Sequence, residues 1–94
     1  MRFHTKILSI RFNQDEFRRD VGEKLKLARR SMGLRQEDMA QVLHRSRAAY
    51  VNMEQGRQAI SLEHLVRLAI VLKKELRDLL PTLDIDDPNT GEGK

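Results

Sequence analysis

Residues 34–56 read LRQEDMAQVLHRSRAAYVNMEQG, and they are the most informative part of the sequence. Its apolar positions predict two short helices, over residues 35–43 and 46–55, joined by a brief turn. The first of these helices would bury Met39, Ala40 and Leu43. Ala40 lies at the expected crossing, where its small side chain lets the two helix axes approach closely. The pattern therefore indicates a tight corner of two helices.

The second helix of this corner has two chemically different faces. Its expected inward residues are Ala49, Tyr50 and Met53. Its outward face mixes hydrogen-bonding groups with small apolar groups, namely Arg47, Ala48, Val51, Asn52 and Gln55. Reading base edges in a DNA major groove requires both kinds of group: donors for guanine, an amide for adenine and a methyl contact for thymine. The outward face therefore has the composition of a base-reading surface.

A longer amphipathic segment precedes the corner. It begins after Asn13, which is followed three residues later by Glu16 as in a capping box, and it ends at Gly33. Its expected inward face is Phe17, Val21, Leu25, Ala28 and Met32. Gly22 lies inside this helix and weakens it by about 1 kcal/mol relative to alanine.

A fourth helix is predicted after the corner, beginning at Ser61, whose hydroxyl can cap it. Its expected inward face is Leu62, Leu65, Val66, Ala69 and Leu72. A last apolar cluster of Leu76, Leu79 and Leu80 comes directly before Pro81, which ends the helical region. Together these segments predict one small all-α domain over residues 13–81.

The two ends of the chain differ from this helical region. Apolar and polar residues alternate around Leu8, Ile10 and Phe12, which predicts a short β-strand in an arm formed by residues 1–12. We expect this strand to pair with a second copy and make a dimer, and folding back along the first helix of its own chain is the alternative. Residues 82–94 are rich in acidic and turn-forming residues, which predicts a disordered tail.

Charge is distributed unevenly along the chain. The net charge is +4, but residues 1–81 hold 17 basic and 10 acidic side chains, whereas residues 82–94 hold one basic and four acidic ones. A basic body with an acidic tail favours a polyanionic partner for the body.

Several kinds of chemistry have no support in the sequence. The chain has no cysteine, and His4, His44 and His64 share no metal-ligand spacing, so we expect neither a metal nor a cofactor. It contains no Ser/His/Asp arrangement and no glycine-rich phosphate loop, which predicts that the protein is not an enzyme. No apolar run approaches the roughly 20 residues of a membrane span, and no secretory signal is recognisable. We expect a cytoplasmic protein without a membrane partner.

The corner and its surroundings resemble the phage-repressor/Cro-type helix-turn-helix family, also called XRE. Residues 34–43 are similar to the family pattern Leu-Thr-Gln-Glu-Glu-Leu-Ala-x-x-Leu. Further matches in register are Ser46-Arg47, Glu54-x-Gly56, Ser61-Leu62-Glu63, Leu65, Leu68-Ala69 and Leu76-x-x-Leu79-Leu80. The resemblance covers residues 20–81 and implies a repressor-like fold of five helices, usually acting as a dimer on a palindromic operator.

The resemblance also implies roles for individual residues. The base edges of the major groove would be contacted by Arg47, Ala48, Val51 and Asn52. The DNA phosphates would be contacted by Gln36, Ser46, Gln55 and Arg57. The backbone N–H of Gln36 is at a helix N-terminus, which favours an anion independently of the resemblance. Arg29 and Glu54 match a pair that forms a partly buried ion pair between the first and third helices in many members.

Some positions depart from the family pattern. His44 replaces a glycine, although histidine tolerates left-handed backbone geometry better than most residues. Arg45 places a charge where the family buries a small apolar residue. Tyr50 replaces Ile or Val, and its hydroxyl is expected at the surface. Lys73 and Lys74 replace a glycine–hydrophobe pair, which predicts that the last two helices run closer to continuous than usual.

These observations predict a transcriptional regulator, a repressor that binds double-stranded DNA at a palindromic operator as a homodimer. Phosphate neutralisation would supply most of the binding energy, and the third helix would supply specificity. The alternative is an antitoxin or adaptor that grips a protein partner, with DNA contact secondary or absent. For the dimer contact, the alternative to the N-terminal arm is the last helix around Leu76, Leu79 and Leu80.

Overall fold

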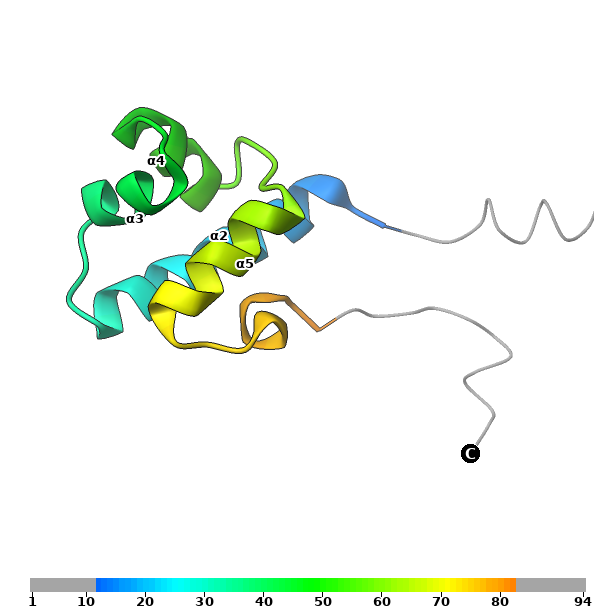
Figure 1. Ribbon diagram of the computed structural model, residues 1–94. Coiled ribbons are helices and arrows are strands. Elements are labelled where there is room, and N and C mark those ends of the chain that lie inside the picture. Colours follow the sequence, from blue (N-terminus) through cyan, green and yellow to red (C-terminus); the bar gives the residue numbers. More distant parts are fainter. Residues whose placement is uncertain (1–11, 83–94) are drawn as a thin grey trace, which may run out of the picture.

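All regular structure is helical in the part of the chain that the computed structural model describes, residues 12–82. Figure 1 shows the elements in order: α2 (Gln14–Ser31), α3 (Gln36–Leu43), α4 (Arg47–Glu54), α5 (Leu62–Leu72) and the 3-10 helix η1 (Leu76–Leu79). Within these residues the predicted all-α fold is confirmed. Apart from Phe12 and Thr82, the predicted N-terminal strand and the predicted C-terminal tail lie outside the described residues.

Side-chain caps begin three of the helices. Asn13, Ser46 and Ser61 cap α2, α4 and α5, since the side-chain oxygen of each accepts a hydrogen bond from the backbone N–H three residues further on, at 2.9, 3.1 and 3.0 Å. Each such cap satisfies a backbone donor that the first turn of a helix leaves free, and it typically stabilises the fold by about 1 kcal/mol. The starts of α2 and α5 are those that the sequence predicted.

The four α-helices within residues 12–82 all end with the same backbone turn. A residue with positive φ follows each helix, and the N–H of the next residue donates to the carbonyl five positions back, at 2.8–3.0 Å. The positive-φ residues are Gly33, His44, Gly56 and Lys73. This Schellman arrangement satisfies carbonyls that the last turn leaves free. His44 therefore takes the left-handed geometry that the sequence requires of it, with φ 55° and ψ 43°.

The turn at Lys73 shows that the expectation of nearly continuous last helices is wrong. Lys73 has φ 57°, and the chain leaves α5 there. The short helix η1 then packs against both α2 and α5. This reversal is what buries Leu79 and half-buries Leu76 and Leu80 against the domain's own core.

The core lies where α3 packs against α4 and α5 and where α2 packs against α4. Its largest fully buried side chains are Tyr50, Leu25, Met39, Met53, Leu68, Leu72 and Leu79. Most of the inward residues predicted for α2, α3 and α4 are buried in this core.

Three residues predicted to face inward are exposed. Met32 is 40% exposed because it follows the last residue of α2, where the backbone already turns toward Gly33. Leu62 and Val66 of α5 are 67% and 40% exposed. The sequence of α5, LEHLVRLAIVL, carries apolar residues on all sides, so periodicity alone does not define which face is buried.

The buried face of α5 consists of Leu65, Leu68, Ala69 and Leu72. A neighbouring side of the helix carries Leu62, Val66 and Ile70, the last of them 71% exposed. Residues four apart on a helix lie above one another on one face. These three side chains therefore form a continuous apolar strip, which we call the α5 stripe.

Candidate nucleic-acid interface

The helix α4 separates its buried and outward residues as the sequence predicted. Tyr50, Met53 and Glu54 are buried, and Ala49 is half-buried. The predicted base-contacting residues share the other face: Arg47 and Ala48 are exposed, and Val51 and Asn52 are half-buried. The turn between α3 and α4 consists of residues 44–46, so the two helices form the tight corner expected of a helix-turn-helix.

A buried carboxylate anchors α4 to the rest of the domain. Glu54 accepts two hydrogen bonds from Arg29 of α2, Nε–Oε2 at 2.7 Å and Nη2–Oε1 at 3.1 Å. The side-chain amide of Gln36 donates to Oε1 at 2.9 Å, and the hydroxyl of Tyr50 donates to Oε2 at 2.9 Å. Both carboxylate oxygens thus have two donors each, which is the condition under which a buried charge is tolerated.

The pKa values of this cluster follow from its geometry. Burial by itself raises the pKa of Glu54, but the hydrogen bonds from Arg29, Gln36 and Tyr50 outweigh it, and the pKa of Glu54 lies below its ordinary value. The hydrogen bond with Glu54 raises the pKa of Arg29. Burial and the neighbouring carboxylate raise the pKa of Tyr50, which keeps its hydroxyl protonated as a donor. The ion pair is therefore fully charged at neutral pH.

Two expectations about departures from the family pattern are settled by this cluster and its surroundings. The hydroxyl of Tyr50 is not at the surface: the residue is fully buried, because Glu54 lies one helical turn further on and accepts its hydrogen bond. Arg45 is exposed in the turn between α3 and α4. Its charge remains in solvent, so the core is not disturbed there.

Gln36 connects the buried cluster to the outward face. Its Nε2 donates to Glu54, while its Oε1 accepts a hydrogen bond from Arg47 Nη2 at 2.9 Å. Arg47 also lies 3.9 Å from the carboxylate of Glu37. The exposed guanidinium at the start of α4 is thereby oriented through one amide by a buried ion pair. Gln36 is half-buried and is the first residue of α3.

The remaining predicted phosphate-contacting residues border α4 at its two ends. Ser46 caps the N-terminus of the helix, and its hydroxyl accepts from the Ala49 N–H. Gln55 follows the C-terminal residue and is exposed. Arg57 is also exposed, and its Nη1 donates to Asn52 Oδ1 at 3.3 Å. Gln36, Ser46, Gln55 and Arg57 therefore flank the outward residues of α4.

Two glycines, Gly22 and Gly56, allow α4 to lie close to α2. The sequence analysis did not predict this role for either of them. A Cβ on the buried Gly22 would overlap the carbonyl oxygen of Glu54. A Cβ on Gly56 would lie 2.8 Å from Arg19 Cγ and 2.9 Å from Arg19 Cα. The backbones of α2 and of the end of α4 are therefore in direct contact. From the sequence alone Gly22 is only a weak point of its helix, because the backbone that approaches it, at Glu54, comes from 32 residues away.

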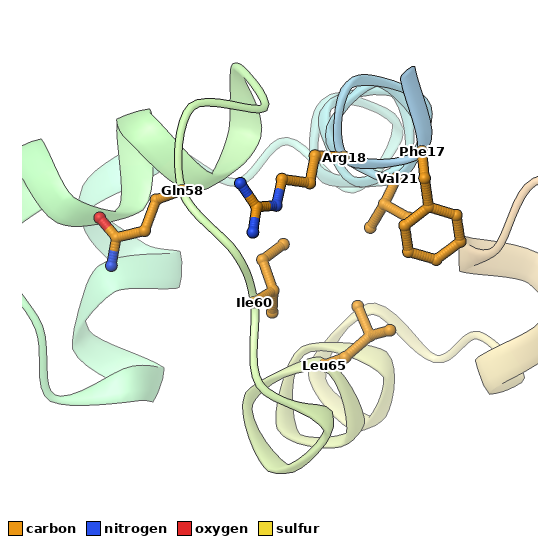
Figure 2. Close-up of a pocket in the computed structure, with 6 residues that line it drawn as sticks. All are labelled: Phe17, Arg18, Val21, Gln58, Ile60 and Leu65. Carbon is orange, nitrogen blue, oxygen red and sulfur yellow. The ribbon is translucent and has the colours of Figure 1, made fainter. Parts of the chain in front are cut away.

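A small, open hollow lies between α2, the loop after α4 and α5 (Figure 2). It is lined by Phe17, Arg18, Val21, Gln58, Ile60 and Leu65. Arg18 is the only ionisable residue of this lining, so the hollow contains neither a nucleophile nor an acid–base pair.

The described part of the chain offers no metal site and no membrane span. Within residues 12–82 no three His, Asp or Glu side chains gather in a way that could hold a metal ion. None of the helices in the same range is both long enough and apolar enough to cross a membrane.

Comparison with known proteins identifies the family. A family model described as Helix-turn-helix (HTH_3) matches residues 25–79, which is more than half of the chain. No curated protein matches the sequence.

Solved structures have the same fold. The restriction-modification controller protein C.AhdI from Aeromonas hydrophila is 31% identical, with a TM-score of 0.61 over 66% of this chain and 94% of that one. The DNA-binding domain of BldD is 23% identical, with a TM-score of 0.63 over 71% and 97% of the two chains. The clp gene regulator ClgR from C. glutamicum is 24% identical, with a TM-score of 0.61 over 66% and 80%.

The chain belongs to the helix-turn-helix family of the XRE type. It is a DNA-binding regulator of this class, with α3 and α4 as its helix-turn-helix.

Proposed function

We propose that the protein is a transcriptional repressor that binds a palindromic operator as a homodimer. The observation that carries this proposal is the outward face of α4. Arg47, Ala48, Val51 and Asn52 share that face, while the opposite face is fixed to α2 through Glu54. A firmly anchored helix whose solvent-facing side carries both polar and apolar groups is what direct reading of a major groove requires.

Each of these residues would contribute a different contact. Arg47 offers paired donors to guanine, and Asn52 offers an amide to a base edge. Ala48 and Val51 offer apolar contacts to the methyl group of thymine. Around them Gln36, Ser46, Gln55 and Arg57 would contact phosphates and fix the register of the protein on the duplex.

The homodimer rests on apolar surface that the domain leaves uncovered. The α5 stripe presents three large apolar side chains to solvent on one helix, and we take it as a candidate contact surface. Leu79 is buried and Leu76 and Leu80 pack on the domain's own core, which disfavours that cluster as the dimer contact. The α5 stripe therefore joins the arm over residues 1–12 as a proposed dimer element. Either would be self-complementary about a two-fold axis.

Sedimentation measurements would distinguish the two dimer elements. If the α5 stripe forms the contact, Ile70→Asp gives a monomer, and deletion of residues 1–12 leaves the dimer intact. If the arm forms it, the two results are reversed. A wild-type chain that is monomeric at every concentration would contradict the homodimer. That outcome would favour the second candidate function, an adaptor or antitoxin whose exposed α5 stripe binds another protein.

Selection of bound duplexes from a random pool tests DNA reading. We expect one palindromic sequence to be enriched and to bind with a steep salt dependence. On that site Arg47→Ala and Asn52→Ala should each cost about 1–3 kcal/mol and relax the preference at one base pair per half-site, with unchanged melting. Arg67→Ala, which removes an exposed charge from α5, is the matched control. Wild-type binding by both α4 variants would refute the assignment.

A further inference from the structure

The contact between Arg57 and Asn52 joins a residue proposed for phosphate binding to one proposed for base reading. Arg57 Nη1 donates to Asn52 Oδ1 at 3.3 Å. The backbone N–H of Arg57 also donates to the backbone carbonyl of Asn52, at 2.8 Å. The two residues are thus linked through both main chain and side chain.

The backbone part of this link is held rigidly. Arg57 follows Gly56, whose φ of 80° makes the left-handed turn that ends α4. In such a Schellman turn the residue after the left-handed one lies over the helical residue five positions earlier, usually through an apolar contact. In this chain those positions hold Arg57 and Asn52, so the contact is polar. Gly56 is in turn packed against the backbone of Arg19, which leaves the turn little freedom to shift.

The side-chain part of the link determines which way the amide of Asn52 faces. A guanidinium has donors only, so the atom that faces Arg57 has to be the carbonyl oxygen of the amide. The Nδ2 group, which has two donors, then points away from Arg57. Among the described residues it makes no hydrogen bond within the protein.

We propose that Arg57 is a positioning residue that makes Asn52 a donor-only reader and thereby selects guanine over adenine at one base pair. This inference rests on the proposed function. An asparagine that reads adenine needs both amide atoms, since Oδ1 accepts from N6 and Nδ2 donates to N7. With Oδ1 committed to a cation, the donor N6–H₂ of adenine is disfavoured there. The two acceptors of guanine, O6 and N7, suit both Nδ2 and the nearby positive charge.

The test is selection from a random DNA pool by wild type, Arg57→Ala, Asn52→Ala and the double variant. We expect wild type to prefer guanine at the position whose preference Asn52→Ala abolishes. Arg57→Ala should lower the guanine-to-adenine ratio at that position by at least about fivefold, the lower end of what a side chain–base pair discriminates. In the Asn52→Ala background, the Arg57→Ala change should alter no base preference.

A charge-matched control separates positioning from phosphate binding. Arg45→Ala removes another exposed cation beside α4 and should weaken binding to all sequences without changing any base preference. If Arg57→Ala behaves like Arg45→Ala, Arg57 contacts phosphate only and the inference is wrong. If wild type enriches no sequence at all, the proposed function fails instead.

The free protein provides a readout that needs no DNA. The side-chain amide of Asn52 should show restricted motion in ¹⁵N relaxation of the wild-type protein. Arg57→Ala should increase the amplitude of this motion, whereas Arg45→Ala should leave it unchanged. Equal order parameters in wild type and Arg57→Ala would overturn the positioning role even if the protein binds its operator.

Discussion

The helices α4 and α5 are held in the domain by different forces. The shorter helix α4 buries Tyr50 and Met53 together with the charged Glu54, and Glu54 is bound by donors from α2, α3 and α4 itself. The longer helix α5 buries only apolar side chains and exposes others along the α5 stripe. Hydrogen bonds are directional, whereas burial of apolar surface is not.

This difference matches the surfaces of the two helices, which are the outward side chains of α4 and the α5 stripe. The outward side chains of α4 contribute to specificity only if the helix keeps its rotation and height to within a fraction of an ångström, and the bonds around Glu54 fix both. An apolar surface such as the α5 stripe requires no such precision, because its energy depends mainly on the area removed from water. The two helices therefore differ in kind: hydrogen bonds fix the orientation of α4, whereas α5 offers apolar area that can be buried.

The largest expected effect is on the polar anchor of α4. Glu54→Ala removes the only carboxylate that neutralises Arg29 in the described structure, and breaking a buried pair in this way typically costs about 3–5 kcal/mol. We expect a drop of that size in the free energy of unfolding, measured by urea titration. The control Glu23→Ala removes an exposed carboxylate of α2 that lies 3.8 Å from Lys26, and it should change stability by less than about 0.5 kcal/mol. Equal losses in the two variants would show that the anchor contributes no special stability.

The apolar anchor of α5 should give a somewhat smaller loss. Leu68 is fully buried, so Leu68→Ala should cost about 3 kcal/mol, within the range for deleting a core leucine. Ile70→Ala on the same helix removes an exposed side chain and should leave the stability of the monomer unchanged. Urea unfolding at low protein concentration measures both. A large loss in Ile70→Ala under those conditions would mean that the α5 stripe packs within the monomer.

The two anchors should differ in their response to acid. The pKa of Glu54 in the folded protein lies below its ordinary value of 4.5, so its ionised form stabilises the fold above that pH. The contribution is lost as the pH falls through the lowered pKa. The stability difference between wild type and Glu54→Gln should therefore be constant from pH 7 to about 5 and shrink at lower pH. The difference between wild type and Leu68→Ala contains no such titration and should stay constant. A Glu54→Gln difference that does not narrow in acid would refute the ionised anchor.

Most of the fold could be predicted from local patterns. The caps Asn13 and Ser61, the stop at Gly33 and the inward residues of α3 all depend on residues within a few positions of one another. The same locality explains why the outward face of α4 could be identified, since a helix of eight residues fixes which side chains share a side.

The features that the sequence could not predict are contacts between residues that lie far apart in the chain. Gly22 is required by the carbonyl of Glu54, and the hydroxyl of Tyr50 is buried because a carboxylate already held by Arg29 accepts it. Likewise, α5 has more apolar residues than one face can bury, and only the position of its neighbours decides that Leu68 is inside and Val66 outside. The contact between Arg57 and Asn52 needs the left-handed turn at Gly56, which places the exposed Arg57 over the half-buried Asn52.

The smallest effect that we predict concerns how the two helices end. At the end of α4, Gly56 is needed twice, for its φ of 80° and for the close approach of Arg19. At the end of α5, the same turn is made by Lys73, whose φ is 57° and whose side chain is exposed. A left-handed conformation costs a non-glycine residue about 1–2 kcal/mol, and glycine avoids this cost at the expense of a more flexible unfolded chain. Lys73→Gly should therefore stabilise the fold by about 0.5–1 kcal/mol, seen as a higher urea midpoint with an unchanged slope. The neighbouring Lys74→Gly replaces an equally exposed lysine outside the left-handed position and should give no gain. If the two variants behave alike, the strain at Lys73 is relieved by other means, and the ends of α4 and α5 are more similar than their sequences indicate.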